Sequence, residues 1–505
     1  MKTITETSGA TVAAPAAGLA VVGSAGRRRW AVLALLAVAQ FAVVLDSSIM
    51  NIALPSIGDE LRVSPENLSW VINAYVLAFG GFLLLGGRLA DLLGRRRMFV
   101  AGLVLFAAAS LVGGLATAAW QLIAARAVQG LGGALLAPAA LSILTTIFPA
   151  GAERNKALGV WGAVAGSGAA AGVLLGGVLT DGLGWEWVLF INVPIGAATA
   201  LLSLRLIPES RGHAGRDGFD LAGAATVTGG LTAAVYGIVE AESAGWAAPT
   251  TLGVFAAAAV LLGAFVIIER RATSPVLPFA IFRLRTVLGA NVTMLFVGAA
   301  MFGLFYFLSL SMQQVLGYTP LQTGLAQLPV AGTLVVAAGL ISPLVTRIGS
   351  KPVTLAGLAA FAAGLVWFSR MPADAGFVTD LLGPSLVVGV GLAATFVALT
   401  VSSVEGITDA ESGLASGLIN TTQQIGGALG LAALTAVAAG RTDSSLNGAV
   451  PAIALNEGFQ AGLLVAAGIV AAAVALTAIV SRGSRPGGQF AATTPGSESR
   501  AQAAA

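Results

Sequence analysis

The chain alternates between long apolar runs and short polar connections. A helix needs about 20 apolar residues to cross a bilayer, and fourteen runs meet that criterion. The first six cover approximately residues 30–57, 68–87, 98–118, 121–147, 157–180 and 187–206. The other eight cover approximately 221–240, 250–268, 287–312, 323–346, 352–369, 381–402, 414–438 and 459–481. The pattern predicts an all-α integral membrane protein with 14 spans.

Basic residues orient these spans. Most of the 26 Lys and Arg residues fall in the tails and in the even-numbered connections. Arg62, Arg370 and Arg441 lie on the opposite side, and Arg126 falls inside a span. Connections rich in Lys and Arg stay in the cytoplasm. An even number of spans puts both ends on one side, so we expect both termini to be cytoplasmic.

The chain also contains an internal repeat. Leu93-Gly94-Arg95-Arg96 closes the second span, and Ile348-Gly349-Ser350-Lys351 closes the tenth. Gly159, Gly168 and Gly172 of the fifth span align with Gly417, Gly426 and Gly430 of the thirteenth. In a chain with 66 glycines such an alignment also arises by chance. The repeat predicts two related bundles of six helices, a type of fold that encloses a central site with alternating access.

This organisation predicts five segments. Residues 1–26 and 483–505 are small and polar, and we expect flexible cytoplasmic tails there. The first tail has no apolar stretch of the kind that a signal peptide carries. We expect a six-helix bundle over 27–207, a linker with two inserted helices over 208–286, and a second bundle over 287–482.

Composition restricts the class of protein further. Hydrophobic residues make up 57% of the chain and charged residues 10%, with a mean hydropathy of +0.90. Soluble domains carry roughly 25% charged residues. The net charge of +3 is small and argues against nucleic acid as a partner. The chain has no cysteine and one histidine, His213, so it offers no thiolate metal site or histidine triad, and we expect no metal, cofactor or enzymatic activity.

Asp46 interrupts the first apolar run, Trp30 to Ile57. A carboxylate at membrane depth is unfavourable by about 2.5 to more than 10 kcal/mol, and such residues mark ion or proton pathways. Asp46 is therefore a candidate proton-coupling residue.

A glycine-rich loop closes the second span with the sequence Gly87-Arg88-Leu89-Ala90-Asp91-Leu92-Leu93-Gly94-Arg95-Arg96-Arg97. Gly87 allows close helix approach and Gly94 a tight turn. Asp91 can accept hydrogen bonds from a helix N-terminus or pair with an arginine across the two halves. We expect Gly87, Asp91, Gly94, Arg95 and Arg96 to form a conformational latch. The alternative is a positively charged anchor with an incidental aspartate.

This loop resembles the signature loop of major facilitator transporters. Arg126 to Ala134 resembles the fourth-helix motif of that superfamily, and Leu45 to Pro55 resembles the first-helix motif of its fourteen-helix drug:proton antiporter branch. Trp185-Glu186-Trp187 and the segment Asn192 to Gly196 also fit that branch. The resemblance covers roughly residues 30–482. It implies efflux of drugs or antibiotics coupled to protons.

The fifth helix departs from the branch. The antiporter motif there normally has a proline after its second glycine, and this chain has Val173 after Gly172. Small residues four apart still permit close helix packing. The kink that the proline would produce is not expected.

Arg126 is a candidate partner for Asp46. The first helix runs outward and the fourth inward, so both residues fall in the outer half of the membrane. A pair whose separation changes with access state would bind and release a proton during the cycle. The alternative is a static structural ion pair.

Several other polar and aromatic residues are candidates for a substrate cavity with apolar walls and a few polar anchors. Helix–helix hydrogen bonding and lipid-facing positions are the alternative for each of them. The candidates are Asn73, Tyr75, Gln129, Trp161, Phe305, Tyr306, Gln313, Asn420 and Gln424. The last six predicted spans contain no clear carboxylate, which predicts weak handling of dicationic compounds and better handling of neutral or zwitterionic amphiphiles.

Together these features predict a proton-coupled exporter of drug-like or antibiotic molecules in a bacterial cell membrane. Its expected partners are a small amphiphilic substrate, a proton and the bilayer, and it is expected to function as a monomer. Export of an endogenous metabolite, such as an amino acid or siderophore, is the first alternative. A membrane sensor that does not transport is the second, and Na⁺ stays open as the coupling ion.

Overall fold

The computed structural model describes residues 17–64, 68–148, 152–210, 220–272, 275, 277, 279–405, 412–446 and 450–480. Within these ranges some helix positions, 17–27, 88 and 91 among them, are described by their backbone alone. The described residues form helices and connections, and they contain no β-strand.

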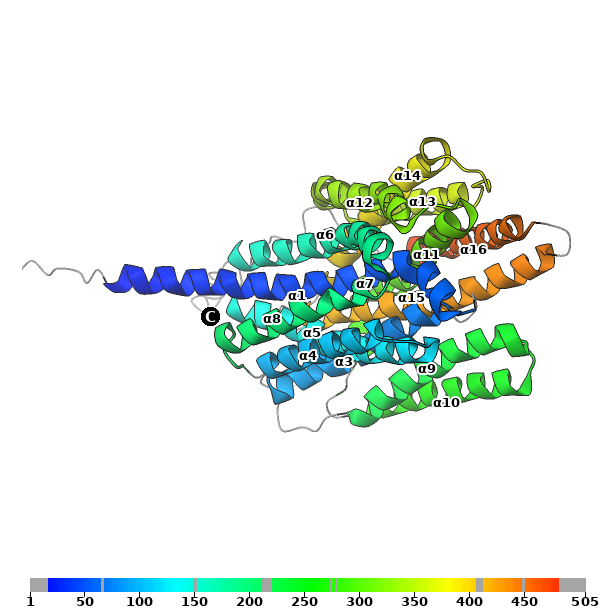
Figure 1. The fold of residues 1–505 in the computed structure, drawn as a ribbon. Helices are drawn as coiled ribbons and strands as arrows, with labels where there is room; N and C mark the ends of the chain where they lie inside the picture. The colour runs from blue at the N-terminus through cyan, green and yellow to red at the C-terminus, as the bar shows by residue number, and fades with distance from the viewer. Residues whose placement is uncertain are drawn as a thin grey trace, which may run out of the picture.

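The helices lie side by side along one common direction (Figure 1). The first part of the chain forms α1 (Ala17–Leu61), α3 (Trp70–Leu93), α4 (Arg95–Gly114), α5 (Ala119–Ile147), α6 (Ala152–Leu183), α7 (Trp187–Phe190) and α8 (Asn192–Leu206). The middle forms α9 (Leu221–Ala244), α10 (Pro249–Arg271) and the 3-10 turn η1 (Phe279–Arg283). The last part forms α11 (Arg285–Leu310), η2 (Ser311–Val315), α12 (Pro320–Ile348), α13 (Ser350–Phe368), η3 (Phe377–Leu381), α14 (Leu382–Val404), α15 (Ser412–Ser445) and α16 (Pro451–Val480).

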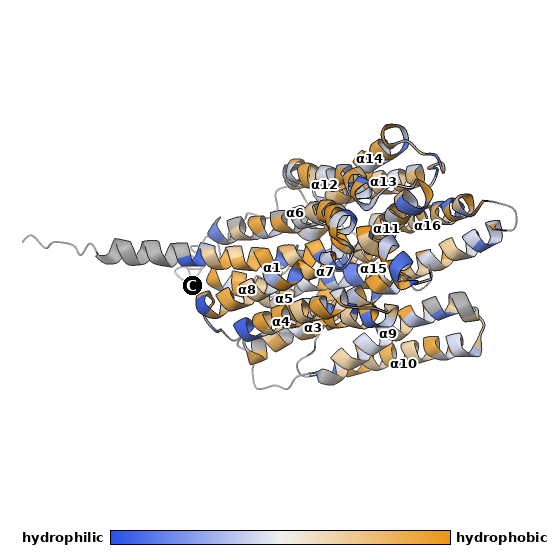
Figure 2. Cartoon of the chain, in the orientation of Figure 1, coloured by the Kyte–Doolittle hydropathy of each residue, from blue (hydrophilic) through white to orange (hydrophobic). Residues whose placement is uncertain are grey.

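Eleven of the described helices are long and apolar enough to cross a membrane, so the chain is a multi-pass membrane protein. Shorter apolar segments lie in α3, α6 and α9, at Trp70–Leu83, Ala171–Leu183 and Ala222–Ile238. Figure 2 shows apolar residues along the helices and hydrophilic residues gathered near the helix ends. Helix α1 begins at Ala17, inside the segment predicted as a tail.

Local signals explain where several helices begin and end. Gly94 separates α3 from α4 with φ of 116°, and Gly349 separates α12 from α13 with φ of 89°. Positive φ favours glycine, which has no Cβ. The start of α12 carries a capping box, in which Thr319 accepts from the Gln322 backbone and Gln322 accepts from the Thr319 backbone, followed by Pro320. The two positive-φ glycines occupy the same place in the two predicted repeats.

Glycine packing supports the repeat in three dimensions. A Cβ on Gly132 of α5 would lie 2.6 Å from Phe106 N and 2.9 Å from Gly102 O of α4. A Cβ on Gly391 of α14 would lie 2.5 Å from Phe361 N and 2.9 Å from Gly357 O of α13.

Among the glycines that align between the fifth and thirteenth spans, Gly172, Gly426 and Gly430 also make close contacts, whereas nothing lies within 4 Å of a Cβ on Gly417. Gly172 of α6 lies against Leu45 and Ser48 of α1, and Gly426 and Gly430 of α15 lie against Leu295 and Ala299 of α11. Two pairs of helices in each half therefore meet through equivalent small residues.

Helices α9 and α10 pack on each other as a pair beside α3 and α15, at the lower edge of Figure 1. Asp220 caps α9 by accepting from Gly223 N at 2.7 Å. Thr228 of α9 donates to Gly81 O of α3 at 2.9 Å, and Gly81 lies against that threonine. The inserted pair is thus attached to α3 from the first part of the chain and to α15 from the last part.

Substituting alanine for Gly86 is expected to destabilise the protein. The added Cβ would lie 2.0 Å from Ala134 O, a backbone atom of α5, so α3 and α5 would have to separate. Overpacking of this kind destabilises by about 1–3 kcal/mol or more. The measurement is the midpoint of thermal unfolding in detergent. The matched control is Gly253→Ala on α10, where nothing lies within 4 Å; equal midpoints for the two variants would contradict the packing described.

Candidate functional site

The site is centred on Asp46 of α1, whose side chain is completely buried. Its Oδ2 accepts from Arg126 Nη1 of α5 at 2.6 Å. Its Oδ1 accepts from Gln129 Nε2 of α5 at 2.8 Å and from Asn192 Nδ2 of α8 at 2.7 Å. Three donors from two other helices therefore converge on one carboxylate.

Gln129 extends this network to a fourth helix. Its Nε2 also donates to Ser110 Oγ of α4 at 2.7 Å, and its Oε1 accepts from Arg126 Nη1 at 2.5 Å. Ser110 in turn donates to Phe106 O, one turn earlier in α4, at 2.8 Å. Arg126 and Gln129 are three residues apart in α5, a spacing that places both on the same face of the helix.

Helix α3 contacts the Arg126 side chain through a backbone oxygen and an aromatic ring. Arg126 Nε donates to Val71 O at 3.1 Å, and its guanidinium lies over the Tyr75 ring, 4.3 Å from the centroid. A guanidinium above an aromatic face is attracted by the negative centre of the ring. The arginine therefore contacts a carboxylate, an amide oxygen, a backbone oxygen and an aromatic face.

The electrostatics of the site follow from this geometry. Asp46 and Arg126 are both at least 99% buried, and a buried ion pair is tolerated when the geometry is good and further hydrogen bonds satisfy both ions. Three donors occupy acceptor positions of the Asp46 carboxylate.

Some buried polar atoms beside the network have no hydrogen-bond partner among the described residues. Asn192 Oδ1 is one such atom, and both amide atoms of Asn73 in α3 are further buried atoms of this kind. Buried polar atoms are normally paired. These atoms are therefore available to a polar ligand or to a rearranged network.

The structure confirms that Asp46 and Arg126 meet, and it places Gln129 in their network. Sequence reasoning missed Asn192 and Ser110 as members. Asn192 begins α8 immediately after a break in the helix at Ile191, and a polar residue at the start of an apolar run was the signal available for it. Ser110 lies in an apolar helix and gives no comparable signal.

The predicted latch residues lie at the ends of α3 and α4. Gly87 lies 3.5 Å from Pro138 of α5, measured from a Cβ built on the glycine. Arg95 N donates to Ser210 O at 2.9 Å, and the Arg95 guanidinium hydrogen-bonds Thr146. Arg96 N donates to Glu209 Oε1 at 3.1 Å. The side chain of Asp91 lies outside what the structure describes.

Glu209, just after α8, is a residue that sequence reasoning missed. Its Oε2 lies 3.7 Å from the Nε atoms of Arg96 and of Arg97. A Cβ on Gly94 would lie 2.6 Å from its Oε1, so the turn and the glutamate fit closely. The contacts described for Gly94 to Arg97 join α4 to α5 and to the segment after α8. They lie within the first half, and a latch across the halves stays a prediction.

The predicted cavity residues fall in three places. Tyr75 and Gln129 lie at or beside the Asp46 network, and Asn73 is buried in α3. Tyr306 is buried against Phe307, and Phe305 and Trp161 are half-buried in the apolar core. Gln424 lies against Gly80, at the contact of α15 with α3, and Asn420 is exposed.

Gln313 joins the two halves. Its Nε2 donates to Ile52 O of α1 at 3.0 Å from the π-helical turn that ends α11. Close to it, a Cβ on Gly177 of α6 would lie 2.7 Å from the backbone of Leu321 of α12, and one on Gly324 would lie 2.6 Å from Val173 O. The halves are thus in tight contact at the end of the molecule that carries Gln313. Helix α6 continues through Val173 without interruption, as its missing proline implies.

The chain matches known proteins over most of its length. Residues 36–431 match the family model described as Major Facilitator Superfamily. The chain is 40% identical over 474 residues to the puromycin resistance protein of Streptomyces alboniger, covering 93% of each protein. It is 43% identical over 418 residues to the cephamycin export protein of Amycolatopsis lactamdurans, covering 82% of this chain and 86% of that protein.

Solved structures agree on the fold. An auto-inhibited peptide transporter of the POT family matches with a TM-score of 0.65 and 17% identity, over 90% of this chain and 97% of that chain. The POT family transporter PepTSo matches with a TM-score of 0.64 and 15% identity, over 90% and 99% of the two chains. The helical fold, the extent of the family match and the identity to the two relatives lead to one assignment: the chain belongs to the major facilitator superfamily, and it is a transporter.

Proposed function

We propose that the chain is a proton-coupled exporter of antibiotic-like molecules that works by alternating access of two six-helix bundles. The observation that carries the proton coupling is the buried Asp46 carboxylate with its three donors. The direction and the substrate class are supported by two relatives, one named for puromycin resistance and one for cephamycin export.

In this proposal, proton binding is coupled to helix movement because a proton and the donor side chains compete for the Asp46 carboxylate. With Arg126, Gln129 and Asn192 in place, their hydrogen bonds to the carboxylate hold α1, α5 and α8 together. A shift of α1 relative to α5 would lengthen the contact of 2.6 Å and expose Asp46 to a proton from outside. The protonated acid no longer attracts Arg126 strongly, so the proton favours the opened arrangement. Return to the paired arrangement releases the proton inside.

In this proposal the protein lies in a bacterial cell membrane with 14 spans and both termini in the cytoplasm, and functions as a monomer. The segments are a 1–26 tail, bundles over 27–207 and 287–482, a 208–286 insert, and a 483–505 tail. The end closed by Gln313 and by the glycines of α6 and α12 then faces outward. The arrangement described is therefore closed to the outside.

A resistance panel tests the substrate class. The chain is produced in a pump-deficient bacterial host, and growth is measured with puromycin, a cephamycin, a dicationic dye and an empty-vector control. Protection against at least one neutral or weakly charged antibiotic is expected, with little protection against the dye. No protection against any antibiotic would contradict the proposal and favour export of an endogenous metabolite.

A crosslink tests alternating access. Because the chain has no cysteine, Ile52→Cys with Gln313→Cys introduces the only two thiols. A short bifunctional thiol reagent should join these neighbouring positions and stop export, because the outer end could no longer open. Each single-cysteine variant, treated with the same reagent, is the control. Export that persists after complete crosslinking would contradict opening at this end.

A further inference from the structure

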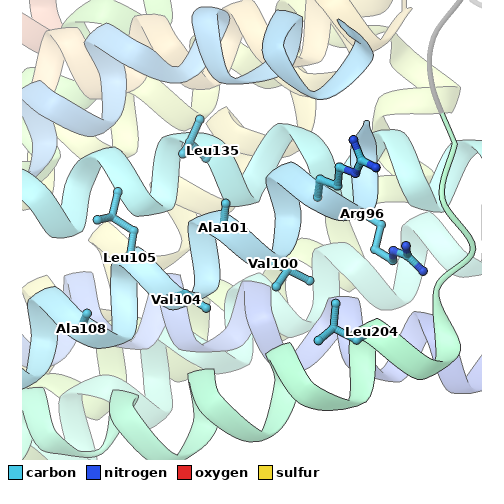
Figure 3. A pocket seen from close by; sticks show the side chains of 9 residues that line it. Arg96, Val100, Ala101, Val104, Leu105, Ala108, Leu135 and Leu204 are labelled. Atoms are coloured by element: carbon cyan, nitrogen blue, oxygen red, sulfur yellow. The ribbon is translucent and has the colours of Figure 1, made fainter. Parts of the chain in front are cut away.

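A groove with a volume of about 740 Å³ lies on the outer surface of α4, α5 and α8 (Figure 3). Arg96 and Arg97 line one end of it, and the rest of its lining is apolar. Figure 3 shows Val100, Val104 and Ala108 following Arg96 along α4, about one turn apart. The groove therefore combines a basic end with a long apolar wall.

The apolar wall faces the lipid. Val104 is 55% exposed and Leu204, on the opposite wall, is 53% exposed. From Arg96 to Ala108 the groove follows α4 for about 18 Å at 1.5 Å per residue. Half of a hydrocarbon core about 30 Å thick is about 15 Å. The groove thus has the length of the acyl chains of one leaflet.

The basic end lies where a lipid headgroup would lie. The Arg97 side chain is 63% exposed, and among the side chains that the structure describes Arg96 and Arg97 share a single acid, Glu209, with N–O separations of 3.7 Å. Arg205 lies in the last turn of α8, and Arg28 donates to Leu206 O at the end of that helix. The arginines outnumber the acid, and the N-terminus of α4 adds a partial positive charge. The end is complementary to a phosphate.

We propose that this groove binds one anionic glycerophospholipid of the cytoplasmic leaflet, with its phosphate at Arg96 and Arg97 and an acyl chain along α4. The choice of leaflet rests on the orientation proposed above. Lipid binding itself does not depend on the transported substrate or on proton coupling. The same arginines fix the turn at Gly94 through Glu209, so an occupied groove would stabilise the loop between α3 and α4.

Native mass spectrometry of the detergent-purified protein tests the proposal, with phosphatidylglycerol and phosphatidylcholine as probes. The wild-type protein is expected to bind phosphatidylglycerol more tightly than phosphatidylcholine. Arg97→Gln should weaken phosphatidylglycerol binding about fivefold, as expected for loss of one arginine at a lipid surface, and should weaken binding of the zwitterionic phosphatidylcholine less. Arg347→Gln, an exposed arginine at the end of α12, is the matched control and should change neither.

The variant Ala101→Trp tests the contribution of the apolar groove to lipid binding separately from that of the arginine charges. This exposed lining residue would fill the groove, and binding of both lipids should fall while the protein elutes normally on gel filtration. Millimolar inorganic phosphate should not displace phosphatidylglycerol. Equal effects of Arg97→Gln and Arg347→Gln, unchanged binding in Ala101→Trp, or displacement by free phosphate would each overturn the proposed lipid site.

Discussion

Cells that produce the Asp46→Asn variant are expected to be as sensitive to the exported antibiotic as cells with an empty vector. The substitution preserves the shape of the side chain but removes the charge that holds Arg126 at 2.6 Å and removes the group that we propose takes up a proton. An asparagine amide nitrogen would also face the donors of Gln129 and Asn192. The measurement is growth inhibition in a pump-deficient host, with protein amounts in the membrane compared by immunoblot.

Asp181→Asn is the matched control for this variant, because Asp181 is an exposed acid near the end of α6. It should protect cells as wild type does. Full protection by Asp46→Asn at equal protein amounts would contradict proton coupling through Asp46. The buried network would then be a structural ion pair, or export would be driven in another way.

Arg126→Gln is expected to abolish export and to destabilise the protein. The substitution leaves the Asp46 carboxylate completely buried without its cation. Breaking a buried ion pair by removing one partner costs about 3–5 kcal/mol, because the remaining charge is uncompensated. The double variant Asp46→Asn with Arg126→Gln removes both charges and should recover part of the thermal stability, but none of the export.

An exposed ion pair provides the comparison. Arg441 Nη2 lies 2.8 Å from Glu457 Oε2, with side chains that are 55% and 37% exposed. Such pairs contribute about 0–1 kcal/mol, so Arg441→Gln should barely shift the midpoint of thermal unfolding. If Arg126→Gln were no more destabilising than Arg441→Gln, or if the double variant were less stable than either single one, the account of the buried pair would be wrong.

The architecture was largely predictable from the sequence, because apolar runs of spanning length are a strong signal. Each predicted span overlaps a described helix, but only eleven of the described helices are long and apolar enough to cross a membrane, and the sixth predicted span is divided at Ile191 into α7 and α8. The repeat was visible in the aligned glycines. In three dimensions Gly132 and Gly391 make equivalent backbone contacts, which a sequence pattern alone does not show.

The centre of the site was predictable and its surroundings were not. Asp46 and Arg126 stood out because charges inside apolar runs are rare. Asn192 lies 146 residues from Asp46 in the chain, and neutral polar residues are common in helix contacts, so its position at the start of an apolar run did not indicate which residue it would contact. Glu209 lies in a polar connection where a glutamate is ordinary, although it determines how the Gly94 turn is held.

The most direct test of the account measures proton movement in liposomes that contain the purified protein and a pH-sensitive dye. The probe is the antibiotic that gives the strongest protection in the resistance panel. Its gradient should drive protons in the opposite direction in wild type and in Asp181→Asn, but not in Asp46→Asn, and replacing Na⁺ with choline should change nothing. Equal proton movement in Asp46→Asn, or movement that requires Na⁺, would contradict proton exchange at Asp46.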